Sequence, residues 1–166
     1  TSDDPEDVID YTLFEYVDRA AALGFGALAL ACHNKFIASP EYETSGSAFA
    51  AMDRELDAAA TGPRWLQDDR VAQCVADALQ YGERQLGLYR LRAWVLMFNH
   101  VHVLIDPEAK LSRITKAIKN YSARQANAIL GRTGQPFWQD ESYDHWVRGP
   151  EEFEKTVRYI EGNPVA

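Results

Sequence analysis

Residues 89–106 carry the pattern that most restricts the fold of this chain. The stretch YRLRAWVLMF alternates in hydrophobicity and is rich in aromatic and branched side chains, and HVHVLID continues that pattern after Asn99. Alternation with a period of two indicates β-strands, and Asn99 between them indicates a turn or a bulge. We therefore predict a pair of antiparallel strands.

Apolar residues with helical spacing surround this pair. They predict helices at residues 47–60, 68–85 and 111–130, and a last helix that begins at Pro150. Residues 8–31 are rich in Ala and Leu, and their spacing fits either a helix or two strands broken at GFG. The pattern indicates one α+β domain, with the acidic segment 1–46 poorly assigned and its leader partly disordered.

The charge of the chain is distributed unevenly. A formal net charge of -8 argues against a nucleic-acid binder when the chain is taken as a whole, because phosphate contacts require clustered Lys and Arg. Residues 109–139, however, contain no acidic residue and six basic ones, namely Lys110, Arg113, Lys116, Lys119, Arg124 and Arg132. We call these six residues the cationic segment, and we expect a polyanion to bind there.

The setting expected from composition is a reducing cytoplasm. The two cysteines form no CxxC pair. The longest apolar run, residues 20–32, is too short to span a bilayer, so no membrane association is expected.

Two histidines, His100 and His102, occur in the second predicted strand. Residues i and i+2 of a strand share a face and lie about 6–7 Å apart, so the two imidazoles could bind one metal ion. Alternatively, they are polar residues on the solvent side of a half-exposed sheet. A histidine-triad hydrolase would need a third histidine at position 104, which is Leu104, so that class lacks its nucleophile.

The motifs NHVHVLI, GRTGQPFWQDESYDHWVR and RYIEGNPVA, in this order, resemble the single-tyrosine transposases of the His-hydrophobic-His (HUH) endonuclease superfamily, in particular the REP-associated tyrosine transposase branch. The resemblance covers roughly residues 50–166. It implies a ferredoxin-like antiparallel sheet with helices on one face, and it places a transposase-like domain at residues 47–166. The chain stops directly after the Asn-Pro motif, where relatives continue, which suggests a shortened C-terminus.

By position, the resemblance makes His100 and His102 the metal-binding pair and Tyr159 the nucleophile. Asn163, which lies at i+4 from Tyr159, would assist with the metal ion. The implied cofactor is Mg²⁺ or Mn²⁺, and the donor set suits Mn²⁺ at least as well as Mg²⁺. Tyr121, which lies between Lys119 and Arg124 of the cationic segment, is the rival nucleophile.

The implied activity is cleavage and transfer of single-stranded or hairpin DNA through a 5′-phosphotyrosine, with a homodimer as one form of the active unit. The alternative is a non-catalytic, domesticated nucleic-acid-binding module of the same fold. Trp138 follows a loop rich in Gly and Pro and could stack on unpaired bases, with core packing as the alternative. The residues expected to contact DNA are Lys110, Arg113, Lys116, Lys119, Arg124, Arg132, Trp138 and Arg148.

Overall fold

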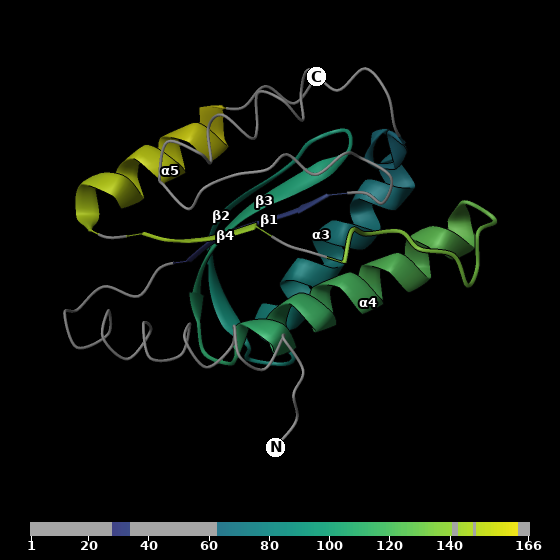
Figure 1. The fold of residues 1–166 in the computed structure, drawn as a ribbon, viewed down its shortest axis with the longest axis horizontal. Coiled ribbons are helices and arrows are strands. Elements are labelled where there is room, and N and C mark those ends of the chain that lie inside the picture. The colour runs from purple at the N-terminus through teal and green to yellow at the C-terminus, as the bar shows by residue number, and fades with distance from the viewer. Residues whose placement is uncertain (1–27, 34–62, 141–142, 148, 163–166) are drawn as a thin grey trace.

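A computed structural model describes residues 28–33, 63–140, 143–147 and 149–162, which form a four-stranded sheet flanked by helices (Figure 1). Neighbouring strands are antiparallel and follow the order β2-β3-β1-β4. The elements are β1 (Leu28–His33), η1 (Trp65–Gln67), α3 (Asp69–Arg84), β2 (Tyr89–Leu96), β3 (His100–Pro107), α4 (Leu111–Ile129), β4 (Tyr143–Trp146) and α5 (Pro150–Gly162). The order β1-α3-β2-β3-α4-β4, with β3 between β1 and β2, is the ferredoxin-like arrangement, so the predicted fold is confirmed.

Strands β2 and β3 are the predicted antiparallel pair. The pairing register shifts between Leu91 and Ala93, so a bulge lies inside β2. The backbone N–H of Met97 donates to the carbonyl oxygen of His100 at 2.8 Å. This bond closes the turn between the two strands, and Asn99 lies in that turn as predicted.

Strand β1 lies between β3 and β4 and therefore has a paired strand on each side. It comes from segment 1–46, in which residues 8–31 fitted either a helix or strands. Leu30 is fully buried, is paired in register with Val103 of β3, and belongs to the same core. The other residues of that segment, and the helix predicted at 47–60, lie outside the described residues.

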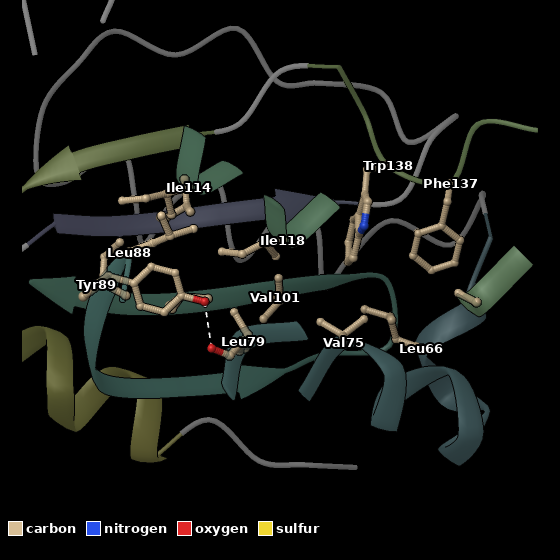
Figure 2. Packing of buried hydrophobic residues seen from close by; sticks show 14 of the residues in the cluster. Leu66, Val75, Leu79, Leu88, Tyr89, Val101, Ile114, Ile118, Phe137 and Trp138 are labelled. Atoms are coloured by element: carbon tan, nitrogen blue, oxygen red, sulfur yellow. Dashed lines mark hydrogen bonds between the residues drawn. The ribbon is translucent and has the colours of Figure 1, made fainter. Parts of the chain in front are cut away.

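The two faces of the sheet bury different sets of side chains. Val101, Val103 and Ile105 of β3 pack in a core beneath α3 and α4, part of which Figure 2 shows. Leu104, on the opposite face, packs with Ile160 of α5. The fold therefore has helices on both faces, where the resemblance implied one, because α5 has an apolar stripe of its own that must be buried (Figure 1).

Helices α3, α4 and α5 confirm three of the four helix predictions. Helix α3 is capped at its N-terminus by Asp68, whose carboxylate accepts a hydrogen bond from the backbone N–H of Arg70 at 3.0 Å. Its buried face includes Val71, Val75, Ala78 and Leu79, which recur at helical spacing as predicted for residues 68–85. Among the described residues, no helix is long and apolar enough to cross a membrane.

Tyr89 connects α3 to the start of β2. Its hydroxyl donates to the carbonyl oxygen of Leu79 at 2.7 Å, as the dashed line in Figure 2 marks. Burial of the ring raises the pKa of Tyr89 well above its usual value. The ring packs directly against Gly82, where an added Cβ would lie 2.7 Å from Cζ of Tyr89.

We expect Gly82→Ala to destabilise the protein by about 1–3 kcal/mol, because the methyl group overpacks a buried ring. This cost exceeds the gain of about 1 kcal/mol that alanine brings to a helix. Urea unfolding followed by circular dichroism measures the difference. Gly149→Ala is the control, since its added Cβ meets nothing within 4 Å, and equal stability of the two variants would contradict the packing argument.

Candidate functional site

The two histidines of β3 lie side by side beneath α5. His100 and His102 are both 0% exposed, and their ring centroids are 4.8 Å apart with an interplanar angle of 82°. Val101 and Val103 point to the opposite core, as the strand period predicts. Complete burial rules out the alternative that these histidines are polar residues on the solvent side of the sheet.

Asn99 is a residue of this site that sequence reasoning treated only as a turn. It is 2% exposed, and its Oδ1 lies 2.6 Å from Nδ1 of His100. An amide oxygen can only accept, so Nδ1 carries the proton and the lone pair of His100 is on Nε2. Metal-binding imidazoles are commonly oriented in this way, by a hydrogen bond from the ring nitrogen that does not bind the metal. The signal in the sequence was the direct Asn-His succession.

Tyr159 approaches the histidines from α5. Its ring centroid is 6.0 Å from that of His102, with an interplanar angle of 74°. The helix is positioned by its apolar stripe, in which Phe153, Val157 and Ile160 pack against the sheet. The structure thus brings together three of the predicted site residues, from elements far apart in the sequence.

The donor set suits a divalent cation. Two adjacent imidazoles, one of which has its tautomer set by Asn99, can bind Mn²⁺ or a later transition metal, whereas Mg²⁺ prefers oxygen ligands. Within the described ranges, no group of three His, Cys, Asp or Glu side chains could hold a metal ion. Asn163 and Arg148 lie outside the described residues.

Tyr121, the rival nucleophile, is far from this arrangement in the fold. It lies on α4, which packs on the face of the sheet opposite α5. Its ring is 41% exposed and stacks on that of Tyr81, with centroids 5.5 Å apart. The structure therefore places Tyr159, but not Tyr121, beside the histidine pair.

The cationic segment divides into two groups. Lys110, Arg113, Lys116 and Arg124 are exposed to solvent. Nζ of Lys119 instead donates to the carbonyl oxygens of Gln139 at 2.8 Å and Asp140 at 3.1 Å. The guanidinium carbon of Arg132 lies 4.3 Å from the centroid of the Trp65 ring. Four of the six cations are thus exposed on α4 or at its start, while two contact other parts of the fold.

Trp138 is a core residue and not an exposed stacking platform. Its side chain is 5% exposed and belongs to the core beneath α3 and α4. Its indole N–H donates to Oγ of Ser122 at 2.8 Å, and Phe137 packs edge-on against its ring (Figure 2). A base cannot stack on a ring whose faces are already covered, which corrects the expectation that Trp138 contacts DNA.

Comparison with known proteins identifies the class that this fold and site define. The family model of IS200-like transposases matches residues 65–163, which include the histidine pair and Tyr159. The chain belongs to the IS200-like transposase family. A search of the curated proteins finds no match.

Two solved structures are similar to this chain. One is a REP-associated tyrosine transposase bound to a REP hairpin, with 16% identity, a TM-score of 0.51, and coverage of 84% of this chain and 67% of that one. The other is a Deinococcus radiodurans R1 protein assigned as a transposase, with 21% identity, a TM-score of 0.49, and coverage of 84% and 92%. At this identity, the first likeness establishes a shared fold.

Proposed function

We propose that this chain is a metal-dependent endonuclease and strand transferase that acts on single-stranded DNA at hairpin or repetitive palindromic elements. The observation that carries this proposal is the placement of the Tyr159 ring 6.0 Å from the ring of His102, which itself neighbours His100. Such a reaction needs a nucleophile and ligands for a metal ion, held at fixed positions. The phenol of Tyr159 can be the nucleophile, and the two imidazoles can be metal ligands.

Tyr159 is the proposed nucleophile. Its Oη forms a bond to phosphorus while the bond from phosphorus to the 3′ oxygen breaks, and that oxygen takes up a proton to become a free 3′-OH. The protein then carries a 5′-phosphotyrosine. This ester retains the energy of the phosphodiester, so a new 3′-OH can displace the tyrosine and complete strand transfer without ATP.

His100 and His102 are proposed to hold the divalent ion, with Asn163 as a further ligand and Asn99 as the residue that orients His100. A free phenol has a pKa near 10 and is therefore a weak nucleophile at neutral pH. When bound, the ion would favour the phenolate and neutralise charge that develops on the phosphoryl oxygens. Both imidazoles are buried, so the surrounding side chains fix their orientation before DNA binds.

DNA is the proposed partner on two grounds. The solved transposase of the same fold is bound to a REP hairpin. In addition, the exposed cations Lys110, Arg113, Lys116 and Arg124 lie in a segment without acidic residues, so that α4 offers positive charge to phosphates despite the net charge of -8.

The test is incubation of the full chain with end-labelled single-stranded hairpin DNA and Mn²⁺, followed by a denaturing gel. We expect a labelled band that migrates with the protein, that disappears in EDTA, and that is lost on protease digestion. If no hairpin and no metal ion yields an adduct while DNA still binds, the non-catalytic binding module is the correct function instead.

Neutralisation of the exposed cations of α4 should change the salt dependence of DNA binding. Lys116 and Arg124 are exposed, whereas Lys119 is held by carbonyl groups, so we choose the double variant Lys116→Gln, Arg124→Gln. If both contact phosphates of a single strand, the slope of log K against log salt should fall in magnitude by about 1.4. Binding measured by fluorescence anisotropy at several salt concentrations checks this.

The matched control for charge is Arg90→Gln. Arg90 is an exposed cation on β2, outside α4, and pairs with Glu108 at 3.3 Å, so that its charge is already offset by a carboxylate. We expect its salt slope to equal that of the unmodified protein. An unchanged slope in the double variant would place the phosphate contacts outside α4.

A further inference from the structure

An exposed pair of stacked aromatic rings lies on the outer surface of the helical layer. Tyr81 of α3 and Tyr121 of α4 are 43% and 41% exposed, and their rings are nearly parallel, with an interplanar angle of 7° and centroids 5.5 Å apart. Neither residue belongs to the core beneath these helices, which is built from buried aliphatic side chains, Tyr89, Phe137 and Trp138. The pair is therefore not needed to fill the interior.

The surroundings of this pair are rich in positive charge. Arg84 follows Tyr81 by three positions and Arg124 follows Tyr121 by three, so each exposed arginine lies on the same side of its helix as the tyrosine. Among the described residues, the carboxylate of Asp77 lies a turn before Tyr81 and accepts a hydrogen bond from Gln73 at 2.7 Å.

We propose that the Tyr81–Tyr121 pair is a stacking platform for unpaired bases of single-stranded DNA, with the neighbouring arginines contacting the phosphates. Aromatic rings beside exposed cations are the combination by which proteins bind single strands without reading their sequence. The helical layer lies on the face of the sheet opposite the histidines and Tyr159. This platform thus holds a segment of DNA other than the one being cleaved, and the proposal rests on the DNA-processing function above.

Fluorescence anisotropy with a labelled oligothymidine in EDTA tests the platform, because no cleavage occurs without a metal ion. Removal of one base-stacking ring in Tyr121→Ala should weaken binding on the order of 10-fold, and Tyr81→Ala should do likewise. Tyr121→Phe keeps the ring and should bind as the unmodified protein does. Tyr121→Leu keeps an apolar contact between the helices but lacks an aromatic face, and it should behave like Tyr121→Ala.

Two controls separate stacking from other roles. Trp94→Ala removes an exposed aromatic ring from β2, at the edge of the sheet, and should leave oligothymidine binding unchanged. A blunt duplex, whose bases are already stacked, should bind the tyrosine variants and the unmodified protein equally. Thermal unfolding by circular dichroism identifies any variant that fails to fold, and Tyr121→Leu then provides the decisive comparison.

Several results would overturn the platform. The first is full oligothymidine binding by Tyr121→Ala and Tyr121→Leu, and the second is an equal loss of affinity for duplex and single-stranded DNA. The third is a loss of self-association, measured by sedimentation, without a loss of DNA binding. That third result would make the pair a contact between two copies of the chain. If the unmodified protein binds no single-stranded DNA, that result would contradict both the platform and the proposed function.

Discussion

Tyr159→Phe should abolish the covalent adduct while leaving the fold and DNA binding intact. The substitution removes one oxygen and preserves the ring, which packs against the core beneath α5 and lies 6.0 Å from the ring of His102. Because no other group replaces the attacking oxygen, adduct formation should fall on the order of 10³-fold or more. A denaturing gel with labelled hairpin DNA measures the adduct, and anisotropy measures the binding.

Tyr121→Phe is the matched control for this experiment. It deletes the same atom from an exposed tyrosine on the opposite helical layer. We expect adduct formation close to that of the unmodified protein. A full adduct yield from Tyr159→Phe, with loss in Tyr121→Phe, would transfer the nucleophilic role to Tyr121 and require the DNA to approach from the other face of the sheet.

Loss of either histidine should remove the divalent-ion site. The rings of His100 and His102 are adjacent, so one ion can be bound by both, and one imidazole alone binds weakly. Calorimetric titration with Mn²⁺ should show a site in the unmodified protein that is absent from His100→Ala and His102→Ala. Both side chains are buried, so replacement by alanine also removes packing volume. His102→Gln keeps more of that volume and is therefore measured beside His102→Ala. Thermal unfolding shows whether each variant folds.

Asn99→Ala provides the graded comparison. It removes the acceptor 2.6 Å from Nδ1 of His100 but leaves both imidazoles in place. Residues that orient a metal ligand typically contribute 10- to 100-fold to metal affinity. Asn99→Ala should therefore bind Mn²⁺ about 10- to 100-fold more weakly than the unmodified protein, but more tightly than either histidine variant. Equal Mn²⁺ binding by the unmodified protein and all the histidine variants would remove the histidine pair from the proposed mechanism.

Local patterns were sufficient to predict most of the regular structure. The β2–β3 pair follows from alternation around Asn99, and α3, α4 and α5 follow from apolar residues at helical spacing. Strand β1 was not predictable in this way, because LALACH is rich in residues that also favour helices. Its strand conformation depends on pairing with β3 and β4, which are distant in the sequence, so only the assembled sheet determines it.

The same distinction separates the candidate site residues. The family resemblance selected His100, His102 and Tyr159 as candidates, and the structure brings them together. The surroundings of Lys119 and Trp138 could not be predicted from the sequence. Lys119 donates to two carbonyl groups and Trp138 is buried, although both were expected to contact DNA. A one-dimensional pattern records the chemical type of a side chain and its neighbours along the chain, but not which side chains from other elements cover it.

The sequence by itself determined that His100 and His102 share one face of a strand, because the period of a β-strand is two residues. It also determined the apolar stripe of α5, from the helical spacing of Phe153, Val157 and Ile160. Only the tertiary structure decided that this stripe packs on the histidine-bearing face of the sheet, while α3 and α4 cover the other face. The physical reason is that each apolar surface must be buried against a complementary one, and this packing sets Tyr159 beside His102 and leaves Tyr121 exposed on the opposite side.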